Sequence, residues 1–228
     1  MSQKKEEIIL AFNAGVFDTI DEFNAEALKT LAENTVLMNR DFLEESDAYR
    51  QAITYPVLCK VVHGELRVAL YRRPSKNSTL PGRFSVGFGG HVEIIDTDLT
   101  EHQLIGNVRG VSEIIATATR RELEEETGLS IVSDYNTLHN TVALIIHNGD
   151  VIGRRHVGFL SVFVLDSDMR QEKLEDGLTL VGLLSKTEIE KFFNDNPNYV
   201  LEEWSRLALG YVFSEMTATM PIVTVTYN

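Results

Sequence analysis

The sequence predicts an α/β fold in which a mixed β-sheet packs between helical layers. β-rich runs recur along the chain, one strongly marked helix interrupts them, and two further helical patterns follow. Strands interleaved with helices in this way are typical of a sheet covered by helices. At 228 residues the chain is long enough for one buried core with additional segments. We therefore expect a single domain over residues 1–228.

The first 50 residues are expected to form a strand and helix layer on the core. Residues 8–12 are mostly large and apolar, which favours a short strand. The apolar residues that follow recur at helical spacing, and Asp18 is placed to cap that helix. The residues of this stripe are Ile20, Phe23, Ala27, Leu28 and Leu31.

Two β-hairpins are predicted further along the chain. Residues 55–62 and 66–72 flank His63-Gly64, and residues 141–146 and 151–165 flank Asn148-Gly149, a pair typical of tight turns. Between the hairpins, residues 84–88 resume a strand that ends at Gly89-Gly90. A strand at 178–184 and helices at 186–194 and 201–213 follow, so residues 185–228 are expected to be helical.

Residues 112–127 form the best-marked helical pattern. Ser112 is placed to cap the first turn, and Gly128 stands just past the last residue. Glu122, Glu125 and Glu126 stand at i, i+3 and i+4, so they project from one face. The opposite stripe is small and suited to packing on a sheet; its residues are Ser112, Ala116, Thr119 and Leu123.

The three carboxylates predict a divalent metal site. Like charges at this spacing destabilise a helix unless a cation lies between them. Mg²⁺ and Mn²⁺ prefer carboxylate oxygens, and Mg²⁺ also engages substrate phosphates. Arg121, four residues before Glu125, can fix the orientation of that carboxylate. An isolated Glu-rich run is more often a solvated surface, so the metal interpretation depends on the surrounding sequence.

Charge and composition exclude several classes of protein. With 21 basic and 34 acidic residues the net charge is −13, which disfavours binding to nucleic acid or to an anionic membrane. The N-terminus is unlike a secretory signal, and no apolar run is long enough to span a bilayer. Cys59 is the only cysteine, which suits a cytoplasmic protein. An acidic chain can still bind a phosphate ester through divalent cations.

Residues 121–129, Arg-Glu-Leu-Glu-Glu-Glu-Thr-Gly-Leu, follow Glu113 after seven intervening residues. This pattern resembles the signature of the Nudix hydrolases, most closely their predicted MutT-like phosphoesterases. The resemblance implies an α/β/α sandwich with a mixed sheet. It also implies that Glu122, Glu125 and Glu126 bind Mg²⁺ or Mn²⁺, and that Glu113, Arg121 and Glu125 are catalytic, with Arg121 orienting and Glu113 an accessory acid.

The first glycine of this signature is displaced. It is expected six residues before Glu113, where Asn107 stands, and the better match is Gly90, which ends a strand and precedes His-Val-Glu. This match adds Gly90 to the expected metal site and leaves an insertion at residues 94–109. We expect the insertion to be a mobile or partner-facing loop at the mouth of the active site, removable without loss of folding.

Further side chains are candidates for substrate contact. Arg72 and Arg83, near Arg73, flank a turn and could hold phosphates, although surface arginines are compatible with the same pattern. His156 could contact substrate or play a structural role. A general base could come from an acidic loop, whose acids are Glu172, Glu175 and Asp176.

The function predicted from these features is hydrolysis of a diphosphate linkage in a nucleoside diphosphate derivative or similar small molecule. A nucleotide sensor without catalysis is one alternative, although all the signature acids are present and no basic stripe follows. A diphosphate isomerase is another, but Cys59 lacks the histidine-proline setting of that enzyme. The expected partner is a small diphosphate, with neither nucleic acid nor membrane, and a homodimer is left open.

Overall fold

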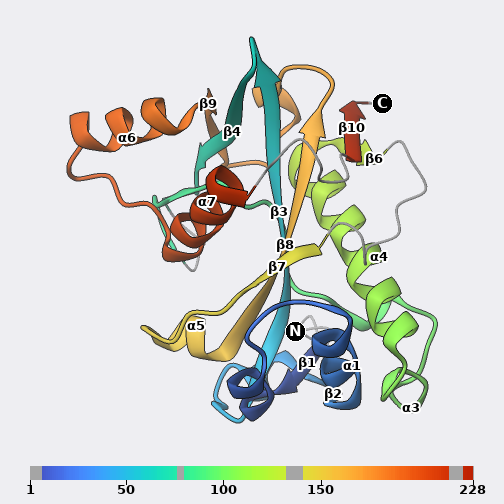
Figure 1. Ribbon diagram of the computed structural model, residues 1–228. Helices are drawn as coiled ribbons and strands as arrows, with labels where there is room; N and C mark the ends of the chain where they lie inside the picture. Colours follow the sequence, from blue (N-terminus) through green and yellow to red (C-terminus); the bar gives the residue numbers. More distant parts are fainter. Residues whose placement is uncertain (1–6, 76–79, 132–140, 216–222, 228) are drawn as a thin grey trace, which may run out of the picture. The chain divides into compact units, whose positions relative to one another are not determined.

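The computed structural model describes residues 7–75, 80–131, 141–215 and 223–227 (Figure 1). The chain divides into two compact units, a first of Met1–Thr54, Gly90–Thr119 and Asn136–Phe159 and a second of Tyr55–Gly89, Arg120–Tyr135 and Leu160–Asn228. Residues 1–6 of the predicted N-terminal layer and 76–79 of the predicted turn lie outside the described residues. Strand β3 (Tyr49–Val62), helix α4 (Val108–Thr127) and strand β8 (His156–Leu165) each contribute to both units.

The first unit begins with the predicted strand. Strand β1 pairs antiparallel with β2 and with the start of β3. Its elements besides the shared ones are β1 (Ile8–Asn13), the 3-10 turn η1 (Ala14–Thr19), α1 (Ala25–Glu33), β2 (Thr35–Asn39), α2 (Arg40–Leu43), η2 (Ile94–Asp96), α3 (Glu101–Leu104), β7 (Thr141–Ile145) and α5 (Val151–Arg155). Leu10 and Phe12 of β1 pack with Leu28 and Leu31 of α1 and with Phe159 in one buried cluster.

Helix α1 begins later than predicted. Asn24, not Asp18, caps it, because the Asn24 side chain accepts hydrogen bonds from the backbone N–H groups of Glu26 and Ala27, both at 3.0 Å. Asp18 lies inside the preceding 3-10 turn. Ala27, Leu28 and Leu31 of the predicted stripe are buried in α1 as expected. Ile20 and Phe23 precede the helix and pack against the same cluster from outside it, so the predicted start was wrong.

Residues 94–109, expected to be a loop, are largely helical. They contain η2, α3 and the start of α4, and Leu104 is fully buried in the main cluster of the first unit. The backbone N–H of Gly106 donates to the carbonyl of Ala32 at 2.7 Å, and that of Leu37 donates to Glu101 Oε1 at 3.2 Å. The segment is thus hydrogen-bonded to α1 and β2 and contributes a side chain to the hydrophobic core. The prediction of a loop at residues 94–109 was therefore wrong.

The second unit contains a mixed set of strands. Its elements besides the shared ones are β4 (Glu65–Arg72), β5 (Phe84–Ser85), β6 (Leu129–Ile131), η4 (Gln171–Lys173), β9 (Thr179–Leu184), α6 (Lys186–Asp195), α7 (Glu203–Glu215) and β10 (Val223–Tyr227). Strand β4 pairs antiparallel with β3, β5 and β9, whereas β10 is parallel to β8 and antiparallel to β6. The mixed sheet is as predicted, but the C-terminal region ends in a strand as well as helices.

One predicted hairpin is confirmed, and the other is confirmed in part, because β7 pairs with β8 but the second strand begins at His156 instead of Val151. His63 and Gly64 both have positive φ, at 51° and 82°, and join β3 to β4 as a tight turn. Residues 151–155 form helix α5 rather than strand, and Asp150 caps it by accepting a hydrogen bond from Gly153 N–H at 2.7 Å. The Asn-Gly pair therefore precedes a helix, whose otherwise free Gly153 N–H is bonded by the Asp150 side chain.

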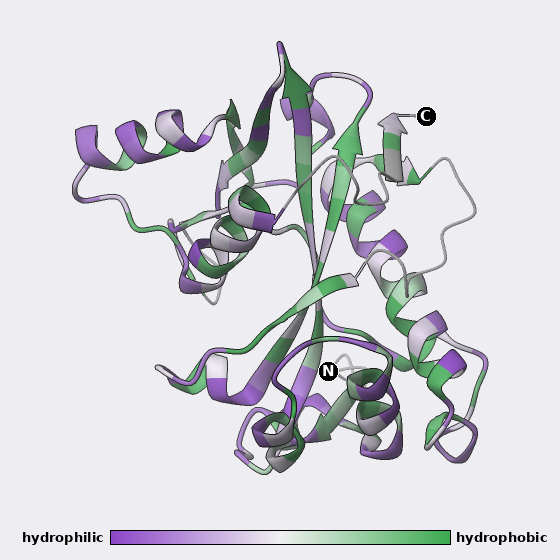
Figure 2. Cartoon of the chain, viewed as in Figure 1, coloured by the Kyte–Doolittle hydropathy of each residue, from purple (hydrophilic) through white to green (hydrophobic). Residues whose placement is uncertain are grey.

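Helix α4 starts before its predicted cap. Asn107 Oδ1 accepts from Gly110 N–H at 2.9 Å, while Ser112 is buried inside the helix. Gly128, with φ +67°, ends the helix and donates to the Glu124 carbonyl at 2.8 Å, as predicted. Hydrophobic and hydrophilic residues alternate around α4 (Figure 2). No helix among the described residues is both long and apolar enough to cross a bilayer.

Candidate metal and active site

The acid face, defined as Glu122, Glu125 and Glu126, lies at the end of α4 in the second unit. Arg121 Nη1 is 3.4 Å from Glu125 Oε2, as predicted, and 2.7 Å from Glu122 Oε1, a contact that the helical spacing did not indicate. The Glu122 side chain is only 13% exposed and that of Glu125 is 60% exposed. Arg121 therefore holds one partly buried and one exposed carboxylate of the same face.

Glu126 is the most perturbed acid of this face. Its Oε2 accepts a hydrogen bond from the backbone N–H of Gly89 at 2.7 Å, which ties the Gly89-Gly90 segment to the helix. This segment was expected to end a strand over residues 84–88, but β5 already ends at Ser85. Loss of hydration raises the pKa of Glu126 to about 8, and the nearby charges of Glu122 and Glu175 add to the rise. Arg73 and the Gly89 N–H oppose it. A cation would stabilise this carboxylate in its charged form.

Arg73 carries the positive charge that acts on Glu126. It forms a buried ion pair with Glu202, whose side chain is 3% exposed, and its guanidinium lies 5.9 Å from the ring centre of Tyr71. Burial by itself would lower the pKa of Arg73, but Tyr71, Glu202 and Glu126 together raise it. The sequence marked Arg73 only as a neighbour of Arg72, because nothing local reveals its distant partner Glu202.

The acidic loop before β9 reaches the acid face. The backbone N–H of Glu175 donates to the carbonyl of Glu126 at 2.9 Å, and the Glu175 side chain is exposed. Because the charge of Glu175 raises the pKa of Glu126, its carboxylate is electrostatically coupled to this face. Among the three acids named for this loop, Glu175 is the one that the structure couples to Glu126.

The other predicted site residues make contacts of their own. Arg72 and Arg83 are exposed, and Arg72 Nε donates to the Gly82 carbonyl at 3.2 Å. Gly90 belongs to the first unit, where its carbonyl accepts from Thr54 N–H at 2.9 Å. Glu113, also in the first unit, forms an exposed i,i+4 ion pair with Arg109 at 2.7 Å. These contacts leave the predicted roles of Gly90 and Glu113 untested.

A second ligand group, missed by the sequence analysis, lies in the first unit. Glu44, His91 and His156, the histidine group, place one ligand atom each within 4.8 Å of one another, and no other such group of three His, Cys, Asp or Glu residues occurs in the described part of the chain. Burial lowers the pKa of His91 to about 3 and also lowers that of His156. No sequence spacing links these residues.

The donor chemistry of the acid face fits a hard divalent ion. It offers carboxylate oxygens only, and two of its three side chains are partly buried where an uncompensated negative charge is unfavourable. Its ligand atoms are less closely gathered than those of the histidine group. Mg²⁺ does not need all three carboxylates within bonding distance at once, since it usually keeps several waters and binds one or two carboxylates together with phosphate oxygens.

Comparison with solved structures identifies the fold. Tm1382, a candidate Nudix hydrolase, superposes with a TM-score of 0.67 at 22% identity, over 92% of this chain and all of that one. A NUDIX hydrolase from Nitrosomonas europaea gives 0.45 at 13% identity, over 72% and 89% of the two chains, which is too distant to carry an argument. No family model and no curated protein sequence matches. The chain has the α/β fold of Tm1382, which confirms the predicted fold class.

Proposed function

We propose that this chain is a Nudix hydrolase that cleaves a diphosphate linkage in a nucleoside diphosphate derivative or a similar small molecule, with Mg²⁺ or Mn²⁺. The observation that carries the proposal is the acid face of α4, with Glu126 tied to the Gly89-Gly90 segment by the Gly89 N–H. Two observations support it: the fold is similar to that of Tm1382, and the signature acids stand together in the last turns of α4.

Glu122, Glu125 and Glu126 would hold the ion, with Gly90 as a further candidate ligand. Such an ion neutralises phosphate charge and lowers the pKa of a bound water. The protein's contribution is to keep the carboxylates in place, and Arg121 does this for Glu122 and Glu125 through its two contacts. Gly89 does it for Glu126, so each acid of the face has an orienting partner.

Glu175 is our candidate for the general base. It is exposed, adjoins Glu126 through the backbone and carries a charge coupled to the acid face. An exposed carboxylate there could accept the proton of an attacking water. Glu113 remains the candidate accessory acid. Arg72 and Arg83 remain candidates for phosphate binding, whereas we leave the buried His156 out of the substrate site.

A product-resolved screen of diphosphate compounds tests the proposal. Nucleoside triphosphates, nucleotide sugars, dinucleotides and non-nucleotide diphosphates would each be incubated with the protein and Mg²⁺ or Mn²⁺. We expect hydrolysis of at least one class, with products that identify the bond cleaved, and its loss in Glu125→Gln. Binding of a nucleotide without any product would favour the sensor alternative, and turnover unaffected by Glu125→Gln would contradict the proposed site.

A further inference from the structure

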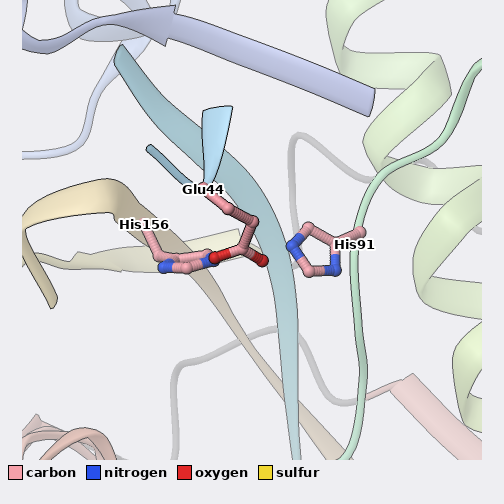
Figure 3. Close-up of side chains that lie close together, drawn as sticks. All are labelled: Glu44, His91 and His156. Carbon is pink, nitrogen blue, oxygen red and sulfur yellow. The ribbon is translucent and has the colours of Figure 1, made fainter. Parts of the chain in front are cut away.

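The histidine group draws its members from three separate parts of the first unit. Glu44 directly follows α2, His91 lies in an extended segment bridged to Ile53, and His156 is the first residue of β8. The Glu44 carboxylate points between the two imidazole rings (Figure 3), whose centres are 5.5 Å apart. All three ligand atoms lie within 4.8 Å of one another. A single ion could therefore be reached by all three side chains.

We propose that Glu44, His91 and His156 bind one divalent transition-metal ion of the Zn²⁺ class. Imidazole nitrogen suits Zn²⁺, Ni²⁺ and Cu²⁺, whereas Mg²⁺ prefers an all-oxygen environment. Two histidines and one carboxylate are a known ligand set for zinc, and they leave the fourth tetrahedral position to water or another ligand. The site differs in donor atoms from the acid face and does not depend on the proposed hydrolase activity.

The hydrogen bond of His156 prepares it as a ligand. Its Nδ1 lies 2.7 Å from the carbonyl oxygen of Ile152. A carbonyl can only accept, so Nδ1 carries the ring proton and Nε2 keeps its lone pair. Metal-binding histidines usually donate their other ring N–H to such an acceptor, which fixes both the tautomer and the ring orientation.

Gln51 supplies a second, independent observation. It is fully buried, and its Oε1 lies 3.0 Å from His91 Nε2. Its amide Nε2 is buried and has no hydrogen-bond partner among the described residues. A buried unsatisfied donor is unfavourable and calls for an explanation. Water on an ion in this group would offer that amide an acceptor.

Two positive charges, Arg40 and Arg155, act on the histidine group and oppose cation binding, and Arg40 contacts a ligand directly. Arg40 Nε lies 3.3 Å from Glu44 Oε1 in a partly exposed ion pair, and Arg40 also pairs with Glu7. A carboxylate has a second oxygen, so Glu44 can bind an ion while it keeps this contact. Because the guanidinium repels the ion, Arg40→Gln should tighten metal binding, a result that a purely hydrogen-bonded cluster would not give.

Zinc binding by the full chain tests the site. Metal-stripped protein would be dialysed against Zn²⁺ in a large excess of Mg²⁺, which competes for sites made of carboxylates alone, and bound zinc would be measured by elemental analysis. We expect one zinc per chain and a melting temperature that rises with zinc concentration. His156→Gln and Glu44→Gln should weaken binding by about tenfold or more. His102→Gln, which alters an exposed histidine on α3, should not.

Two further results separate this proposal from the hydrolase proposal. Glu126→Gln should keep zinc binding even where it abolishes hydrolysis. If His156→Gln fails to fold, the zinc affinity of Glu44→Gln tests the site in its place. Glu44 is partly exposed and therefore tolerates substitution better. The site is refuted if folded wild-type protein takes up no zinc in excess Mg²⁺, if His102→Gln weakens binding as much as Glu44→Gln does, or if Glu126→Gln removes the zinc.

Discussion

The acid face and the histidine group differ in their donor atoms, their charge and the way the chain brings their ligands together. The acid face presents three carboxylates from one helix and is partly open to solvent. The histidine group presents one carboxylate, the partly buried imidazole of His91 and the buried imidazole of His156, from three segments. Oxygen donors with several negative charges favour Mg²⁺ or Mn²⁺, whereas imidazole favours Zn²⁺. The two units therefore offer different chemistry, and substitutions in one should leave the other intact.

The largest effect is expected from Leu104→Ala in the first unit. Leu104 is fully buried in the core cluster, so its truncation should lower the free energy of unfolding by about 2–5 kcal/mol. Ile105→Ala is the matched control, because Ile105 is 47% exposed and should change stability by less than about 0.5 kcal/mol. Urea unfolding measures both. Equal small changes would mean that residues 94–109 are the peripheral loop that the sequence predicted.

In the second unit, Glu126→Gln should reduce hydrolysis on the order of a hundredfold or more. That loss corresponds to about 2.7 kcal/mol of transition-state stabilisation, within the range expected for removal of a metal ligand. Glu124→Gln serves as the control, since Glu124 is exposed and lies off the acid face. Steady-state kinetics in Mn²⁺ compares the two. Similar rates for both variants would contradict a metal site on this face.

Glu126 should also make metal-free stability depend on pH. Its folded pKa of about 8 is above the ordinary 4.5, so the folded state binds this proton more tightly. The stabilisation is present below about pH 4.5 and is lost as pH rises through about 8. Denaturant unfolding in chelator should therefore show wild type losing stability relative to Glu126→Gln across this window. Parallel pH curves would show that Glu126 is not desolvated in the folded protein.

The smallest effect is expected from Glu113→Gln. Its partner Arg109 is 88% exposed, and an exposed i,i+4 pair contributes about 0.3–0.5 kcal/mol. Thermal melts should therefore hardly distinguish this variant from wild type. Its turnover is the informative measurement, because a clear loss of kcat without loss of stability would support the accessory-acid role implied by the signature. Unchanged turnover would reduce Glu113 to a surface ion pair.

Much of the fold followed from local pattern, and the errors share one cause. Strand β1, the β3–β4 hairpin and the end of α4 at Gly128 were predicted correctly, because alternation and turn residues act over a few positions. The starts of α1 and α4 were misplaced, since Asn24 and Asn107 cap them in place of the residues chosen. Several polar residues near each helix start could have served as the N-cap, and tertiary packing decided which of them does.

In the candidate site, too, contacts within one helix were predictable and contacts between distant segments were not. The contact between Arg121 and Glu125 follows from helical spacing and was predicted, whereas its shorter contact with Glu122 was not. Gly89, Arg73 and Glu175 influence Glu126 from positions far away in sequence. Burial and charge at Glu126 are set by these distant groups, so its raised pKa had no signal in the sequence.

The sequence by itself determined the α/β class and the alignment of three acids on one helix face. Both depend on periodicity, which repeats every two residues in a strand and every 3.6 in a helix. Only the tertiary structure decided that residues 94–109 join the core and that Glu44, His91 and His156 meet. Such contacts form when distant segments fold together to bury apolar surface, and no spacing along the chain encodes them.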